Sequence, residues 1–163
     1  MALSFLITLV VAAAPAVCRE PDLAWQYEAM SNLYAPPVVA DVTPEPGLET
    51  LVCDSEAKIL RCISAAGAQL WEFDGDWAKR LVSLPALSGP CVDGRRRIAV
   101  TNGDGSLTCL NAATGKALWR EKPGSVEWGG PLWMPGATGA DPVLIVPTVS
   151  RGVYAYDAGG RLL

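Results

Sequence analysis

The side chains of this 163-residue chain that could do chemistry include five cysteines and seventeen acidic residues, and there is no histidine. Imidazole is the base in Ser-His-Asp and Cys-His nucleophiles, and it is the nitrogen ligand of histidine-rich metal sites. All of these mechanisms are therefore excluded for this chain. The cysteines, one acidic loop and one basic cluster remain as candidates.

The five cysteines stand at spacings that match no zinc or haem motif: Cys18, Cys53, Cys62, Cys91 and Cys109. We expect Cys53 and Cys62 on consecutive strands of one hairpin, where a turn near residues 57–58 would set them roughly opposite each other. In an oxidising compartment they could form a disulfide. Directly opposed strand positions strain disulfide geometry, however, and Cys62 aligns with Cys109 in the repeats described below. Ordinary buried thiols are therefore the alternative.

Two polar segments could bind ions. Asp41–Gly47 has closely spaced oxygen-bearing side chains, which suit calcium, but Thr43 and Pro44 interrupt the alternation of ligands. A proline-stiffened surface loop is the favoured interpretation. Arg95–Arg97 could bind a phosphate or an acidic partner, although in a chain of net charge -4 a solvated turn flank is favoured.

The composition narrows the fold and the partners. Half of the residues are apolar and 18% are charged, which excludes a disordered tail and a charged coiled coil. Sixteen glycines and thirteen prolines favour short strands joined by tight turns. The negative net charge argues against a nucleic-acid partner, because such proteins gather basic charge to contact phosphates.

The N-terminus resembles an export signal. Met1–Cys18 has no charged side chain, and the apolar stretch Leu3–Ala14 has the length of a signal-peptide core but is short for a membrane span. Ala14-Pro15-Ala16 supplies the small residues of a cleavage site, so we predict a signal peptide over 1–16 and an N-terminal lead over 17–24. The protein would then be periplasmic or extracellular, with no stable transmembrane span after cleavage. An uncleaved anchor or a buried first strand is the alternative.

One sequence unit occurs three times. Gly67-Ala-Gln-Leu-Trp71 recurs as Gly115-Lys-Ala-Leu-Trp119, and Gly160-Arg-Leu-Leu163 matches the first four positions. A further tryptophan stands upstream at Trp25. Counted from Trp25, Trp71 and Trp119, the units cover 25–70, 71–118 and 119–163 and have lengths of 46, 48 and 45 residues. These lengths fit a four-stranded propeller blade.

Each unit is expected to hold four strands. The first begins at a proline, the second is an apolar central strand, the third alternates, and the fourth starts at the tryptophan after a glycine turn. The prolines are Pro37, Pro85 and Pro131, and the turn glycines are Gly67, Gly115 and Gly160. We expect the glycines to permit the turns and the tryptophans to fill the wedge between neighbouring sheets. A sheet with two apolar faces must stack on copies of itself.

The proline-led strand, the stretches Val38–Val42 and Leu110–Gly115, and the closing Gly115–Trp119 resemble the PQQ-type β-propeller repeat, named after pyrroloquinoline quinone. The resemblance covers about residues 23–163. It implies an all-β fold of four-stranded antiparallel blades, PQQ-like or WD40-like, in rings of about seven or eight. Three blades cannot close, so we expect an incomplete ring, an N-terminal fragment whose remaining blades are its partners. Trp25–Met30 would be the strand that completes the last blade.

Function is less constrained than fold by this resemblance. Members of the family include quinoprotein alcohol dehydrogenases, which hold PQQ beside calcium, and exported scaffolds. The aspartate base, the carboxylate ligand and the adjacent cysteine pair of the dehydrogenases have no match here, so we assign no catalytic, cofactor-binding or metal-binding residue. We expect an exported scaffold, without enzymatic activity, that binds another protein or a surface polymer. The alternative is the N-terminal part of a PQQ-dependent alcohol dehydrogenase, whose PQQ and calcium ligands lie in other blades.

Overall fold

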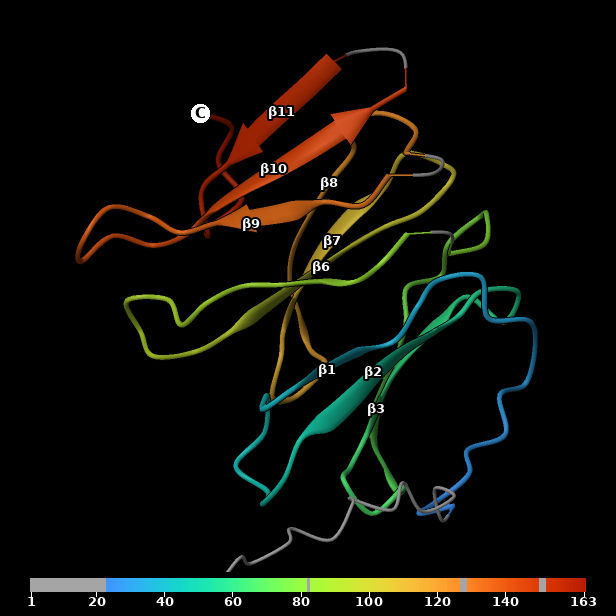
Figure 1. Ribbon diagram of the computed structural model, residues 1–163. Coiled ribbons are helices and arrows are strands. Elements are labelled where there is room, and N and C mark those ends of the chain that lie inside the picture. Colours follow the sequence, from blue (N-terminus) through green and yellow to red (C-terminus); the bar gives the residue numbers. More distant parts are fainter. Residues whose placement is uncertain (1–22, 82, 127–128, 150–151) are drawn as a thin grey trace, which may run out of the picture.

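The computed structural model describes residues 23–81, 83–126, 129–149 and 152–163, and these form three antiparallel sheets (Figure 1). The predicted signal peptide over 1–16 and Cys18 lie outside the described residues. In the ranges that are described, no helix is long and apolar enough to cross a membrane. The expected all-β fold of antiparallel four-stranded blades is confirmed by two of the three sheets.

The strands follow one another within each sheet in chain order. The first sheet consists of β1 (Val38–Ala40), β2 (Glu49–Asp54), β3 (Ile59–Ile63) and β4 (Gln69–Asp74). The second consists of β5 (Ala86–Leu87), β6 (Arg97–Thr101), β7 (Leu107–Asn111) and β8 (Ala117–Glu121). The third consists of β9 (Leu132–Met134), β10 (Val143–Thr148) and β11 (Gly152–Tyr156).

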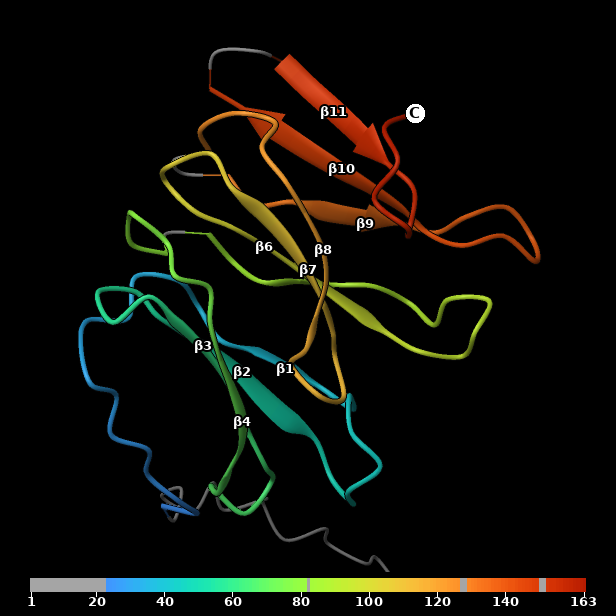
Figure 2. The same ribbon diagram turned by 180° about the vertical axis from the view of Figure 1, so that it is seen from behind.

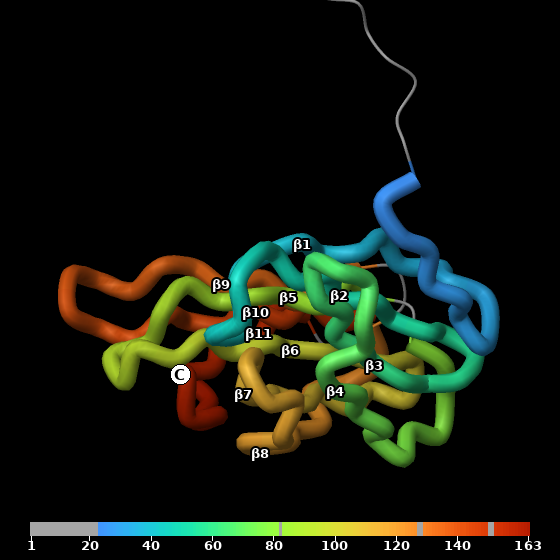
Figure 3. The backbone as a smooth tube through the Cα atoms, turned by 90° about the horizontal axis from the view of Figure 1, so that it is seen from below, coloured from blue at the N-terminus to red at the C-terminus, as the bar shows by residue number. Residues whose placement is uncertain are grey.

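The three sheets are stacked in the order of the chain, from the first, in blue and green, to the third, in red (Figures 1 and 2). The opening strands β1, β5 and β9 lie along one edge of the stack, and β4 and β8 lie along the opposite edge (Figure 3). Strands β5 and β9 are in contact. The stack is therefore an arc of blades whose first strands line one side.

The sequence signals place most strand boundaries within a residue or two. Strands β1, β5 and β9 each begin directly after Pro37, Pro85 or Pro131. The fourth strands, however, begin two residues before the tryptophan rather than at it, so this expectation is wrong. Pairing resumes soon after the glycine turn, and a register shift between Cys62 and Ile63 in β3 accommodates the extra residue of β4. An equivalent shift occurs between Cys109 and Leu110.

Residues 23–37, which precede the first sheet, form no strand. Residues 23–29, including Trp25, have no regular hydrogen-bonded partner strand in the structure. The following residues lie against the first sheet, where the Ser55 amide donates to the Asn32 carbonyl at 3.2 Å. The predicted unit boundaries at Trp71 and Trp119 fall inside β4 and β8, because each sheet closes with the tryptophan strand of the sequence unit that follows.

The second sheet buries both of its faces, as strand alternation requires. Ile98, Val100 and Leu110 pack with the first sheet in one apolar cluster. Ala99 and Cys109, which point the other way, pack with the third sheet in a second cluster. Each interface between blades is thus a separate hydrophobic core.

Replacement of a buried side chain at the first interface should destabilise the fold strongly. Leu110 is 0% exposed, so Leu110→Ala is expected to cost about 2–5 kcal/mol in the free energy of unfolding, measured by denaturant titration. Leu118, on the adjacent strand, is 45% exposed, and Leu118→Ala should cost much less. Equal losses in the two variants would contradict the assignment of this core.

Candidate functional site

The tryptophan that begins each sequence unit contacts the turn glycine near the end of the same unit. A β-carbon at Gly67 would lie 2.8 Å from the Cβ of Trp25, and one at Gly115 would lie 2.6 Å from Cε3 of Trp71. At Gly160 the corresponding distance to Cδ2 of Trp119 is 2.8 Å. Side chains larger than a hydrogen atom cannot occupy these positions without displacing the ring.

This contact extends the interpretation made from the sequence. The glycines were expected in turns and the tryptophans in wedges, and the structure places the glycine of each unit under the tryptophan that begins it. The signal that could have revealed the pairing is the recurrence of both residue types together in every unit. Among the prolines that open the first strands, Pro85 and Pro131 are buried and Pro37 is exposed.

The two complete tryptophan contacts differ in polarity. Nε1 of Trp119 donates a hydrogen bond to the Ala158 carbonyl at 2.9 Å, and its ring stacks near Tyr156 with centroids 6.1 Å apart. Nε1 of Trp71 is buried and has no hydrogen-bond partner in the described part of the chain. The interface between the second and third sheets therefore has an anchoring hydrogen bond that the first interface lacks.

Glu49 is a fully buried carboxylate that holds the loop after β1. Its Oε2 accepts hydrogen bonds from the amides of Val42 and Thr43 at 2.8 and 3.2 Å, and its Oε1 accepts one from the Thr43 hydroxyl at 3.1 Å. The loop considered as a calcium motif is thus fixed by a carboxylate of its own blade. Thr43, which interrupts that motif, is a structural donor.

Asp54, the second fully buried carboxylate, forms an ion pair with Arg61 on the neighbouring strand, with Nη1 and Oδ2 2.6 Å apart. It also accepts hydrogen bonds from the Ser31 hydroxyl and, at 2.9 Å, from the Met30 amide. Burial by itself raises the pKa of Asp54, but these hydrogen bonds and the Arg61 charge outweigh it, and the pKa is lowered below 3.8. This carboxylate ties residues 30–31, which precede β1, to the first sheet.

The structure does not place Cys53 and Cys62 opposite each other, which is the arrangement expected for the possible disulfide. Cys53 pairs across the hairpin with Leu60, and Cys62 pairs with Leu51, so the two cysteines are offset rather than opposed. Both thiols are free. The reason is the position of the turn, which puts Asp54 opposite Ile59 and so moves the register away from the one expected.

The buried cysteines are chemically quiet. Burial raises the pKa of Cys53, Cys62 and Cys109 to about 12. A thiol with so high a pKa carries almost no thiolate at neutral pH, and the thiolate is the nucleophile and metal ligand. Cys62 pairs across the strands with Trp71, and Cys109 pairs with Trp119. Each thiol therefore lies beside a tryptophan on the same face of its sheet.

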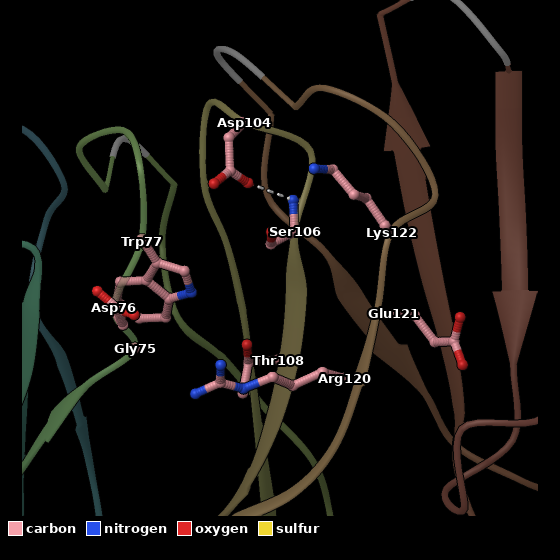
Figure 4. Close-up of a pocket in the computed structure, with 9 residues that line it drawn as sticks. All are labelled: Gly75, Asp76, Trp77, Asp104, Ser106, Thr108, Arg120, Glu121 and Lys122. Atoms are coloured by element: carbon pink, nitrogen blue, oxygen red, sulfur yellow. Dashed lines mark hydrogen bonds between the residues drawn. The ribbon is translucent and has the colours of Figure 1, made fainter.

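Several hollows lie between the sheets in the described part of the chain. One, of about 370 Å³, is lined by Trp77 from the loop after β4 and by residues of β7 and β8, including Thr108 and Arg120 (Figure 4). A second, of about 270 Å³, brings Asp41–Pro44 of the first sheet to Gly94–Arg96 of the second. A third, also about 270 Å³, lies between Gly89–Pro90 and the end of β9.

Across residues 23–81, 83–126, 129–149 and 152–163, no three Asp, Glu or Cys side chains gather as metal ligands.

In the second hollow, Arg95 and Arg96 face the Asp41 loop, whereas Arg97 pairs with Asp93 at 3.3 Å. The basic cluster is therefore divided between an ion pair and the rim of a hollow.

The ring contact can be separated from backbone strain by two glycine variants. Gly115 and Gly94 both have positive φ, of 67° and 75°, but a β-carbon at Gly94 would meet nothing within 4 Å. Gly94→Ala should therefore cost only the backbone term, about 1–2 kcal/mol in the free energy of unfolding. Gly115→Ala should cost more because it also displaces Trp71. Equal costs by denaturant titration would show that the ring contact contributes nothing.

Loss of the Asp54 charge should change the dependence of stability on pH. Asp54→Asn leaves Arg61 buried without its closest counter-charge and is expected to cost about 3–5 kcal/mol at pH 7. Because the folded pKa is lowered, the wild-type stabilisation is present above pH 3.8 and is lost as the pH falls through the folded pKa.

The difference in unfolding free energy between wild type and Asp54→Asn should therefore shrink below pH 3.8, as measured by denaturant titration at several pH values. Asp157→Asn is the control, because its partner Arg161 is 79% exposed and surface pairs contribute about 1 kcal/mol or less. A difference that stays constant from pH 7 to pH 3 would contradict the role of Asp54.

Comparison with solved structures finds two propellers of similar fold. BamB from Moraxella catarrhalis matches with a TM-score of 0.60 and 16% identity, covering 86% of this chain and 38% of that one. Quinohemoprotein alcohol dehydrogenase from Comamonas testosteroni matches with a TM-score of 0.58 and 23% identity, covering 86% of this chain and 22% of that one. At these identities the likeness shows the fold alone. The chain spans less than half the length of either structure.

Comparison with curated protein sequences gives no match. A family model described as outer membrane protein assembly factor BamB matches residues 56–163, about two thirds of the chain. This range contains β3 and β4 of the first sheet and all of the second and third sheets. The chain belongs to the family of PQQ-type β-propeller repeats that this BamB model describes.

Proposed function

We propose that this chain is part of an exported β-propeller that acts as a non-catalytic scaffold and binds another protein or a surface polymer. The observation that carries the proposal is the use of the buried reactive groups. The Glu49 and Asp54 carboxylates accept hydrogen bonds from amides and hydroxyls of their own blade and of residues 30–31, which precede it. Cys53, Cys62 and Cys109 are thiols with a pKa of about 12. The carboxylates stabilise the blades through these hydrogen bonds, and the thiols carry almost no thiolate at neutral pH.

The family supports a protein as the partner. Its model carries the name of an assembly factor, and a factor that assists assembly acts through contact with other proteins. Blade stacks provide such contacts because their loops and strand edges are held on a rigid framework. A periplasmic or extracellular location belongs to the same proposal, together with further blades that complete the ring.

The first test asks whether the protein is an enzyme. Full-length protein reconstituted with calcium and PQQ is expected to give no alcohol-dependent reduction of an artificial electron acceptor above the rate with PQQ and calcium alone. Robust turnover would overturn the scaffold proposal and establish the quinoprotein alternative.

The second test asks for the partner directly. Cross-linking in intact cells, followed by purification of the tagged full-length protein and mass spectrometry, should give one envelope protein in near-stoichiometric amount. Binding must then be reproduced with the two purified proteins. A protein found only in the cytoplasm would contradict the proposed export.

A further inference from the structure

The hollow of about 370 Å³ between the first and second sheets, here named the Thr108 groove, has an unusual set of donors. Its wall on the second sheet is formed by β7 and β8, and its opposite wall by Trp77, from the loop after β4 (Figure 4). Thr108 and Arg120 are direct register partners on these two strands. Both therefore project from the same face of the sheet, towards the first blade.

A second cation follows two positions along the same strand. Lys122 lies on the same side of the chain as Arg120 because alternate residues share a face, and both line the groove. Glu121, between them, is also among the residues that line the groove, although its carboxylate points to the other side of the strand in Figure 4. The groove thus receives two positive charges from β8.

These donors lack partners within the described residues. Thr108 lines the groove and is 0% exposed, and its Oγ1 is buried without a hydrogen bond within the described residues. No ion pair involves Arg120 or Lys122 in the described ranges, and Cζ of Arg120 lies 5.6 Å from the centroid of the Phe73 ring. A buried hydroxyl without a partner costs stability, which a ligand that accepts its proton would recover.

The Asp104 carboxylate, which lines the groove, already accepts hydrogen bonds from the protein. The Asp104 oxygens accept hydrogen bonds from the Ala78 amide at 3.2 Å and from the Ser106 amide at 2.8 Å. Asp104 therefore closes the end of the groove by tying the loop after β4 to the turn before β7. Asp76 and Glu121 also line the groove, so its charges are mixed, but Thr108 and Arg120 project side by side from one face of the sheet. A hydroxyl and a guanidinium placed in this way can both donate to one acceptor with negative charge.

We propose that the Thr108 groove binds a carboxylate, held by the Arg120 guanidinium and the Thr108 hydroxyl with Lys122 at the rim. A planar carboxylate matches the fork of a guanidinium. The negative charges of Asp104 and of Asp76, which also lines the groove, oppose a ligand with two charges such as phosphate. A free carboxylic acid and a carboxylate of a partner protein share this chemistry. This inference does not depend on the scaffold proposal.

The test is calorimetric titration of the full-length protein with benzoate, and with benzamide as the neutral analogue of the same shape. Benzoate should bind saturably and benzamide should not. Arg120→Gln should weaken benzoate binding about tenfold or more, because it removes a charge-assisted pair. Lys116→Gln, at the far end of β8 in the turn after β7, is the matched control and should leave binding unchanged.

Thr108→Val removes the hydroxyl with little change in shape. It should weaken benzoate binding several-fold while its melting temperature stays equal to that of wild type or rises, because the lost hydroxyl has no partner in the free protein. This variant keeps the proposal falsifiable if Arg120→Gln folds poorly. A lower melting temperature would show that the hydroxyl is already bonded, and it would overturn the argument.

Two further arms distinguish the source of the carboxylate. Binding of a tripeptide with a free C-terminus, but not of its amide, would assign the groove to protein carboxylates, whereas binding of benzoate alone would assign it to small acids. Equal binding of benzoate and benzamide, tighter binding of inorganic phosphate, or no saturable binding of any carboxylate would each overturn the proposal.

Discussion

The seating of an indole ring on a glycine is the contact on which the blade stack depends. The ring occupies the place where a β-carbon would stand in Gly67, Gly115 and Gly160, so the rings and the turns fit only together. The turn glycine fixes where the fourth strand begins, and the ring fixes how closely the next unit approaches. Each of the two apolar clusters lies beside such a contact. The side chains in both clusters can pack only when neighbouring sheets approach as closely as the ring and glycine allow. The second sheet, buried on both faces, has no stable position without its neighbours.

Much of this arrangement could be predicted from the sequence, because the repeat displays each structural role three times. The prolines marked the first strands, and the apolar and alternating runs marked the second and third. The starts of β4 and β8 could not be predicted, since the register shifts beside Cys62 and Cys109 depend on how the strands pair in space. The same limitation affected Cys53 and Cys62, whose separation along the chain does not fix the hairpin register.

The partners of the buried polar groups could be predicted from the sequence even less well. Glu49 and Asp54 are ordinary acidic residues in the sequence, and only the structure shows that backbone amides and Arg61 surround them. The Thr108 groove could be anticipated only in part. Thr108 and Arg120 belong to one hairpin, but Trp77, which faces them, comes from the loop after β4. The shape of a site between two blades depends on how far apart their sheets lie, and a sequence pattern within one unit does not give that distance.

The register shift opposite each docking tryptophan also bears on how the chain can change in length. Deletion of one residue between Gly67 and Trp71 would turn the indole to the opposite face of the sheet, because side-chain direction alternates at each position. Length changes in the long connection between β4 and β5, or between β9 and β10, would leave both ring contacts in place. Evolutionary variation in loop length should therefore concentrate in those two connections, whereas the four-residue step from glycine to tryptophan tolerates substitution at its middle positions but no insertion.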